Sequence, residues 1–310
     1  MYSNCQLCPN HCGVDRRMRP GACGQKDVVK VAWSGLHRGE EPPVTGEHGS
    51  GMIFFTGCPL GCAYCQNWQI SMPSPEAYGI EVTVDELCRM MLALEQMGAA
   101  TLNLVTGSHF IPSITEALDK AKGEGFSLPV VWNSSGYESL EGLALIDPYI
   151  DLYLVDVKTC DKAVARVFCG KEAYVDAIWP VMDFITSRHP HTDVEALSGT
   201  LVRHLVFPGT IAATRRFLKR FARDYKDSCA LSLMVQFIPP KGDVDFPPMG
   251  DEDYDSLIDL LEELDIAEGF VQDRSDDDIL WIPDFRKDVP FPASFADASP
   301  YFLSLKHTKL

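Results

Sequence analysis

Short continuous runs of apolar residues recur along most of the chain, and longer amphipathic stretches separate them. A strand exposed on one face would alternate apolar and polar residues, whereas these runs do not alternate. They therefore predict strands that are buried on both faces, as in a parallel sheet covered by helices. The six predicted strands cover residues 52–56, 102–106, 129–132, 151–157, 200–207 and 231–238.

Helical periodicity fills the stretches between these strands. The segment Thr83-Val-Asp-Glu86 has the pattern of a capping box, in which the threonine and the glutamate satisfy each other's free backbone amides. Apolar side chains then recur at helical spacing as far as Leu94, and Gly98 ends the predicted helix. The other predicted helices cover residues 113–122, 140–146, 173–187, 214–224 and 251–264.

The alternation of strands and helices predicts the fold class and the organisation of the chain. Six βα units indicate an α/β fold, a partial (β/α)6 TIM-like barrel that is open on one side. A cysteine-rich segment over residues 1–50 precedes the barrel and is expected to bind metal, and the barrel itself covers 51–268. Residues 269–310 form a C-terminal extension for which no element is predicted.

Composition agrees with a globular protein and narrows the classes of partner. The chain has 310 residues, of which 46% are hydrophobic, so it can bury a large core. It has no apolar stretch of about 18 residues or more, so no membrane span is predicted. The first residues lack the features of a signal peptide, which favours a cytoplasmic location.

The charge balance bears on nucleic-acid binding. The formal charge is −17, from 27 basic and 44 acidic residues, and phosphate backbones should repel such a chain. Non-specific binding of nucleic acid is therefore not expected. One group of basic residues has the spacing of an exposed helix face and is interpreted as a solvated surface: Arg215, Arg216, Lys219, Arg220 and Arg223.

Cysteines are the strongest chemical signal, because seven of the eleven fall within the first 65 residues. Clustered cysteines in a reducing compartment indicate metal binding or catalysis rather than disulfides. Cys58, Cys62 and Cys65 directly follow the first predicted strand of the barrel, where active sites of such folds lie. Three thiolates would leave one iron of a cluster open for a substrate. A structural zinc site would need a fourth ligand, and none is close in sequence.

The spacing C-x3-C-x2-C, with Tyr64 before the third cysteine, resembles the signature of the radical S-adenosylmethionine (SAM) superfamily. The resemblance covers roughly residues 51–240. It implies a [4Fe-4S] cluster whose open iron chelates SAM, with Tyr64 near the adenine. It also implies that one electron from the reduced cluster breaks the sulfur–C5′ bond, and that the resulting 5′-deoxyadenosyl radical abstracts a hydrogen atom.

Polar residues at the ends of the later strands add a finer resemblance. Asp156 and Lys158 are two apart on a strand, so they share a face, and burying both requires that they pair with each other or with a ligand. Together with the V-R-x-x-V-x-P-G run at 202–209, they resemble the activating enzymes of glycyl-radical enzymes, such as the activator of pyruvate formate-lyase. That resemblance implies that Asp156 and Lys158 contact SAM.

The same resemblance implies weaker contacts at two other strand ends. Gly107 and Ser108 stand where the family has a glycine-rich turn that meets the SAM amino group, although the glutamate that often follows is missing here. Asn133 stands where the activators typically have aspartate. His109 and His204 are also near strand ends, and packed histidines and site histidines are equally compatible with the pattern.

A second group of cysteines near the N-terminus comprises Cys5, Cys8, Cys12 and Cys23. Four thiolates can saturate either one zinc ion or one iron–sulfur cluster, and the spacing does not choose between them. His11 is an alternative ligand. The C-x2-C-P start, Gly-Ser-Gly at 49–51 and Cys-Gln-Asn at 65–67 resemble an uncharacterised subgroup of radical SAM enzymes related to pyruvate formate-lyase activators.

The four remaining cysteines are scattered, and single buried cysteines usually behave as small hydrophobic residues. This interpretation is given to Cys88, Cys160, Cys169 and Cys229. Cys160 and Cys169 follow the fourth predicted strand of the barrel, so they could approach the site.

The sequence thus predicts a radical SAM enzyme, an oxidoreductase of the activating-enzyme type. Its substrate would be a protein, a peptide or a small molecule, and a flavodoxin or ferredoxin would supply electrons. The alternative hypothesis is a non-catalytic iron–sulfur electron carrier or metal-binding scaffold. An electron carrier has no need of Asp156 and Lys158 at a cavity, and the acidic charge disfavours an enzyme that modifies RNA.

Overall fold

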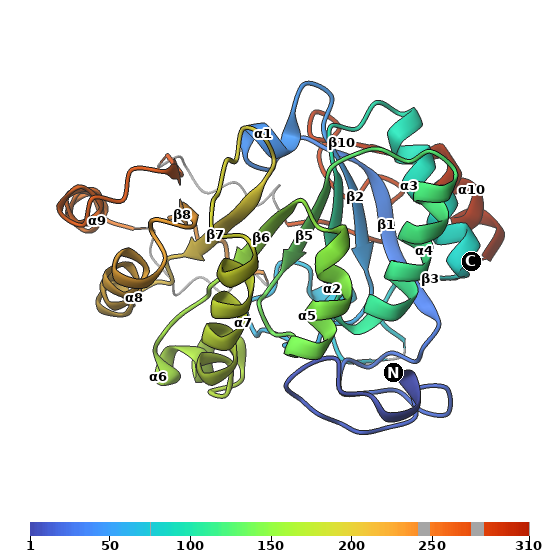
Figure 1. Cartoon of the computed structure of the whole chain (residues 1–310), viewed down its shortest axis with the longest axis horizontal. Helices are drawn as coiled ribbons and strands as arrows, with labels where there is room; N and C mark the ends of the chain where they lie inside the picture. The colour runs from blue at the N-terminus through green and yellow to red at the C-terminus, as the bar shows by residue number, and fades with distance from the viewer. Residues whose placement is uncertain (75, 241–248, 274–281, 310) are drawn as a thin grey trace.

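In the computed structural model, which describes residues 1–74, 76–240, 249–273 and 282–309, one sheet of ten strands forms the centre (Figure 1). Its order is β10-β1-β2-β4-β5-β6-β7-β8-β9, with β3 paired to β1 off this path. Every pair from β2 to β9 is parallel, while β1 runs antiparallel to β2, β3 and β10. The strands are β1 Val29–His37, β2 Ser50–Phe55, β3 Ile80–Val82, β4 Leu102–Val105, β5 Val130–Ser134, β6 Leu152–Asp156, β7 Gly199–Leu205, β8 Ala230–Met234, β9 Gly269–Val271 and β10 Ala296–Ala298.

Helices connect consecutive parallel strands and cover the outer face of the sheet (Figure 1). The sheet does not close, because β9 and β10 each have a single neighbour among the described residues. The prediction of an open α/β barrel is confirmed. The helices are α1 Pro42–Thr45, α2 Trp68–Ser71, α3 Val84–Gln96, α4 Ile111–Gly123, α5 Leu140–Ile146, α6 Lys162–Val164, α7 Tyr174–Arg188, α8 Ile211–Asp224, α9 Asp251–Glu263 and α10 Pro300–Lys309.

The start of α3 shows how local sequence sets a helix boundary. Thr83 Oγ1 accepts a hydrogen bond from the Glu86 amide at 3.1 Å, and Glu86 Oε2 accepts one from the Thr83 amide at 2.8 Å. This is the predicted capping box, and it satisfies two backbone donors that the first turn leaves free. One face of the helix is buried, including Leu87, Met91 and Leu94, and packs against the core.

The N-terminal and C-terminal segments contribute strands that the hydrophobic pattern did not predict. β1 lies within the segment that showed little periodicity, yet all but one of its residues are buried. Its partner β10 packs closely at Gly35, where a side chain would come within 2.2 Å of the Asp297 carbonyl oxygen and within 2.5 Å of the Trp33 ring of β1 itself. Lys30, Ser34 and Gly35 interrupt the apolar residues of β1, so the sequence shows neither a continuous apolar run nor a regular alternation.

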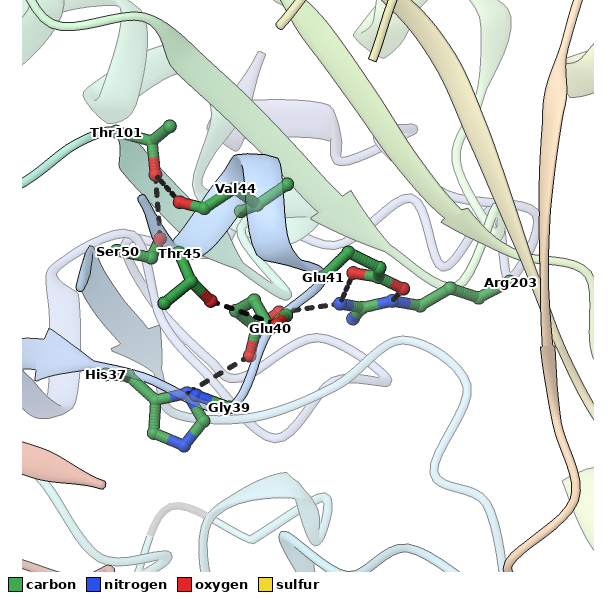
Figure 2. A network of polar contacts seen from close by, with 9 residues as sticks. All are labelled: His37, Gly39, Glu40, Glu41, Val44, Thr45, Ser50, Thr101 and Arg203. Atoms are coloured by element: carbon green, nitrogen blue, oxygen red, sulfur yellow. Dashed lines mark hydrogen bonds and ion pairs between the residues drawn. The ribbon is translucent and has the colours of Figure 1, made fainter. Parts of the chain in front are cut away.

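The short helix α1 fills the interior of the barrel at the N-terminal ends of the parallel strands. Val44 is fully buried in α1, and its backbone oxygen accepts a hydrogen bond from Thr101 Oγ1 at 3.1 Å, while Thr101 and Ser50 hydroxyls meet at 2.8 Å (Figure 2). Since this end is filled, a ligand site can only lie towards the other end of the interior. Val44 packs against the inward-facing side chains Val131, Leu152, Leu154, Leu201 and Ala230.

Residues 1–23, which carry the four N-terminal cysteines, lie at the opposite end of the sheet from α1 (Figure 1). Hydrogen bonds fasten this segment there: the Asn10 side chain donates to the Pro59 carbonyl at 2.7 Å, and the Ser139 amide donates to the Leu7 carbonyl at 3.1 Å. The segment therefore sits next to the loop that carries the predicted cluster cysteines. Within the described ranges, no helix is long and apolar enough to cross a bilayer.

The capping box gives a first testable prediction. Thr83→Ala should lower the free energy of unfolding by about 1 kcal/mol, because the Glu86 amide loses its acceptor. Thr83→Ser keeps the hydroxyl and serves as the matched control, with little expected loss. Denaturant titrations should show a lower midpoint for the alanine variant alone, with the slope unchanged. Equal midpoints for the two variants would contradict a stabilising cap.

Candidate functional site

The loop after β2 brings the three predicted cluster cysteines to one end of the barrel. Cys58, Cys62 and Cys65 all line the same cavity, and their side chains are partly exposed to it. The loop is shaped by glycines and by its neighbours: the Gly61 amide approaches Cys58 Sγ at 3.5 Å, and the Ala63 amide donates to the Phe168 carbonyl at 2.9 Å. Three sulfur donors on one loop therefore face one space.

Burial determines the protonation of these thiols in the absence of a metal. Burial raises the pKa of Cys58 to about 12, and burial also raises the pKa of Cys65. Buried thiols of this kind stay protonated without a strong positive partner, and iron ligation supplies one. The three residues thus fit a cluster with one iron left open. Among the residues that the structure describes, no three Cys, His, Asp or Glu side chains are grouped as the ligands of a single metal ion.

The cavity has a volume of about 400 Å³ and lies at the carboxyl ends of the parallel strands. That volume suits a small-molecule ligand, and the carboxyl ends of the strands are where α/β barrels hold their active sites. Besides the three cysteines, predicted residues from several strand ends line it. These are Tyr64, Asn133, Asp156 and Lys158.

Asp156 and Lys158 form an ion pair inside this cavity, with 3.0 Å between Lys158 Nζ and Asp156 Oδ2. Tyr174 of α7 fixes the end of β6, because its hydroxyl donates to the Asp156 carbonyl at 2.7 Å and accepts from the Lys158 amide at 3.0 Å. Burial would lower the pKa of Lys158, but the negative charges around it, that of Asp156 foremost, together outweigh burial and raise the pKa well above its usual value. The lysine therefore remains charged in the cavity.

Tyr64 stands at the centre of an aromatic group beside the cysteines. Its ring meets that of Phe207 edge to face at 4.6 Å, and Phe168 and Phe237 complete the group. The Lys158 ammonium lies 5.4 Å from the centre of the Tyr64 ring, within the range of a cation–π contact. The aromatic residue of the cysteine motif and the charged pair of β6 thus lie side by side.

Gly107 and Ser108 do not line the cavity. Thr106 does, in the left-handed conformation with φ of 58°, whereas a side chain at Gly107 would run into Ile114 and the Trp132 ring on the helix side. Ser108 is buried and donates to Glu138 at 2.6 Å. Both residues therefore support the turn after β4 from the side that faces away from the cavity.

His109 and His204 are packed in the protein interior. His109 Nε2 meets the Thr56 carbonyl at 2.8 Å, and burial lowers the pKa of His109 to about 3. His204 lies between the Val157 carbonyl at 2.7 Å and Thr214 Oγ1 at 3.1 Å, and burial lowers its pKa to about 4. Neither ring lines the cavity, so both act as neutral structural residues in this structure.

A buried charge network at the floor of the cavity was missed by sequence reasoning (Figure 2). Arg203 of β7 donates to Glu41 Oε1 at 2.8 Å and to Glu40 Oε2 at 2.7 Å, and His37 Nδ1 lies 3.2 Å from Glu40 Oε1. Burial would raise the pKa of Glu40, but Arg203 and His37 outweigh it and lower the pKa to about 2. The glutamates precede a Pro-Pro pair in a segment without periodicity, so no local pattern marked them as interior residues.

Cys169 also proves to be a neighbour of the site. It ends a π-helical turn over Ala165–Cys169, and its buried sulfur is hydrogen-bonded to Cys62, a contact that lowers the pKa of Cys169. The interpretation of Cys169 as an ordinary small hydrophobic residue therefore misses one of its contacts. Its position after β6 was the only signal that it could approach the cysteine loop.

The charge network predicts a specific pH dependence of stability. Because the pKa of Glu40 falls from 4.5 to about 2 on folding, its contribution is complete above pH 4.5 and is lost as the pH falls towards 2. The shift corresponds to about 3 kcal/mol. Glu40→Gln should remove this part of the acid dependence, as measured by denaturant unfolding between pH 2 and 6. The exposed Glu47→Gln is the control, and parallel pH profiles for the two variants would contradict the prediction.

Comparison with known proteins places this site in a family. Residues 52–221, over half of the chain, match the radical SAM superfamily. An uncharacterized protein of Methanocaldococcus jannaschii is 25% identical over 274 residues, which cover 86% of this chain and 76% of that protein.

Solved structures agree on the fold. The FeFe-hydrogenase maturase HydG from Carboxydothermus hydrogenoformans superposes with a TM-score of 0.50 at 13% identity, covering 70% of this chain and 52% of HydG. A radical SAM methyltransferase from Sphaerobacter thermophilus superposes with a TM-score of 0.50 at 14% identity, covering 74% of this chain and 68% of the methyltransferase. The chain spans about half the length of several solved structures that it matches. On the match over residues 52–221, the chain belongs to the radical SAM superfamily.

Proposed function

We propose that Cys58, Cys62 and Cys65 hold the [4Fe-4S] cluster that membership of the family implies, and that the cavity beside them binds SAM. The observation that carries this proposal is the gathering of the three cysteines, Tyr64 and the Asp156–Lys158 pair around one space of about 400 Å³. When bound, the cluster supplies the electron that cleaves SAM and releases a 5′-deoxyadenosyl radical. The protein is accordingly an enzyme.

The side chains around the cavity have separate roles in this proposal. The Lys158 ammonium and the Asp156 carboxylate hold the polar groups of SAM, and they pair with each other until the ligand arrives. Tyr64 packs near the adenine within its aromatic group. The Asn133 amide lines the cavity and can both donate and accept hydrogen bonds. Gly107 and Ser108 act indirectly, by shaping the turn that presents Thr106.

For the substrate, we propose a protein or peptide segment, with a glycyl-radical protein as the leading candidate. Support comes from the β6 and β7 sequences, Asp156 to Lys158 and residues 202–209, which are similar to those of activating enzymes. An open sheet leaves room for a protein loop to enter at the strand ends. A small-molecule substrate is the second candidate, and a flavodoxin or ferredoxin is the proposed electron donor.

The segments of the chain divide this work. We propose that residues 1–50 bind a metal centre, that 51–268 hold SAM and its cluster, and that 269–310 support them. Within the last segment, β10 pairs with β1 and α10 packs against α3, while Gln272, Pro283 and Phe291 line the cavity. The alternative of an electron carrier leaves the buried charges of the cavity without a purpose, since an electron carrier needs no polar ligand pocket.

Anaerobic turnover tests the proposal directly. The reconstituted, dithionite-reduced protein should convert SAM into 5′-deoxyadenosine, and Cys58→Ala, Cys62→Ala and Cys65→Ala should each abolish the product. Cys229→Ala, a buried cysteine outside both clusters of cysteines, is the matched control and should keep it. A fully loaded protein that neither binds nor cleaves SAM would establish the electron carrier instead. Adding a candidate glycyl-radical protein and recording its radical by electron paramagnetic resonance (EPR) then tests the substrate class.

The role of Lys158 is tested by binding. Lys158→Met removes a charged donor from the cavity, so SAM affinity should fall by about 10- to 100-fold in calorimetry of the anaerobic, cluster-loaded protein. Lys162→Met is the control, because Lys162 is exposed and pairs with Asp176 at the surface. Iron content should be the same in both variants. Unchanged affinity in Lys158→Met would show that the pair with Asp156 is only structural.

A further inference from the structure

The four N-terminal cysteines are brought together although they are spread over residues 5–23. Cys5, Cys8 and Cys23 are buried, and Cys12 is partly buried. A side chain at Gly21 would lie 3.4 Å from Cys12 Sγ and 3.6 Å from Cys23 Sγ, so these two sulfur atoms are no more than about 7 Å apart. Cys8 interacts electrostatically with Cys5 and Cys23, and Cys23 with Cys5 and Cys12. The sulfur atoms of Cys12 and Cys23 therefore flank the space beside Gly21, and Cys5 and Cys8 lie close enough to interact with Cys23.

A buried cation faces these thiols without a carboxylate partner. Arg16 is fully buried, and its guanidinium donates to the carbonyl oxygens of Gln25, Lys26 and His109. No ion pair of the described residues includes Arg16, whereas its charge acts on Cys23. The centres of the Tyr2 and Phe110 rings lie 5.0 and 5.4 Å from the guanidinium, so all of its partners are neutral, and a negative centre next to it would neutralise the buried charge. Thiolates bound to a metal provide such a centre.

A second cation lies between the two groups of cysteines. Lys171 Nζ donates to Asn10 Oδ1 at 2.8 Å and to the Pro59 carbonyl at 2.7 Å, and no carboxylate in the described residues pairs with it. Its charge acts on Cys8 of the N-terminal group and on Cys58 and Cys62 of the barrel loop. The Lys171 ammonium therefore interacts electrostatically with both groups of cysteines.

Asn10 completes the connection at atomic distance. Its Nδ2 lies 3.4 Å from Cys8 Sγ and 2.7 Å from the carbonyl oxygen of Pro59, the residue that follows Cys58. Cys8 Sγ and the Pro59 carbonyl are therefore at most about 6 Å apart. A purely structural zinc knuckle has no need of such a link to a redox loop, nor of a cation shared with it.

We propose that Cys5, Cys8, Cys12 and Cys23 bind a second [4Fe-4S] cluster, and that Asn10 and Lys171 couple it to the first. Four thiolates suit this cluster type, and its negative charge satisfies Arg16 and Lys171. The second cluster takes one electron from a low-potential one-electron donor of the ferredoxin or flavodoxin class and is reoxidised as it passes that electron to the first. No proton or bond changes place in this step. The relay rests on the proposed function of the first cluster.

Metal content separates the two sites. The full chain is reconstituted anaerobically with iron and sulfide, and iron, sulfide and zinc are measured per chain. The wild type should hold twice the iron of the double variant Cys8→Ala/Cys23→Ala, and the triple variant of Cys58, Cys62 and Cys65 should also lose half. Cys88→Ala is the control and should keep both clusters. An N-terminal variant with undiminished iron, or zinc that disappears with Cys8 and Cys23, overturns the proposal while leaving the first cluster intact.

Lys171→Gln tests the coupling without touching a ligand, and therefore stays informative if the cysteine variants misfold. Removing a positive charge near a cluster disfavours its reduction, so the reduction potentials of both clusters should fall. The exposed Lys162→Gln is the matched control and should change neither. In the reduced wild type, EPR signals of the two clusters should broaden each other, and the double variant should give one simple signal. A shift at one cluster only, or no mutual broadening, contradicts the bridge.

Discussion

The pairing of charges inside the barrel is the constraint on which the site depends. Arg203 on β7 can be buried only because Glu40 and Glu41 reach it from the far side of the interior, at 2.7 and 2.8 Å. That contact joins the segment before β2 to the second half of the sheet, across an interior that Val44 otherwise fills with apolar contacts. It thereby fixes the floor above which the cysteines, Tyr64 and Lys158 are arranged.

Pairing of opposite charges also applies at the two cysteine groups, where cations lie beside groups that become negative when they bind metal. The chain carries a formal charge of −17, yet three cations lie beside its sulfur atoms: Arg16, which is fully buried, and Lys158 and Lys171, which are partly buried. A cation beside a thiolate cluster makes an added electron less costly, since it opposes the negative charge that accumulates there. The acidic surface and the cationic interior therefore serve different purposes, and net charge alone gives no guide to the site.

The sequence patterns predicted those parts of the structure that depend on interactions between residues close in sequence. The parallel strands from β2 to β8, the capping box at Thr83 and the position of Cys58 after a strand could all be inferred, because each depends on neighbours in sequence. β1 could not, because Lys30, Ser34 and Gly35 interrupt its apolar residues and leave no continuous run. The contacts of Arg203 with Glu40, of Cys169 with Cys62 and of Lys171 with Asn10 join residues distant in sequence, and only the fold brings them together.

Burial of the thiols also links the state of the metal to the stability of the fold. Burial raises the pKa of Cys58 to about 12 and that of Cys8 to about 11, so without metal both side chains are protonated at neutral pH. Ligation to iron must release these protons, which makes cluster binding stronger as the pH rises. The N-terminal segment has no regular strand or long helix before β1, and Gly21 leaves a space between the sulfur atoms of Cys12 and Cys23. Metal bound there would cross-link the N-terminal segment, which lacks the backbone hydrogen bonds of regular helices and strands. It would also hold Asn10 against the loop of the first cluster.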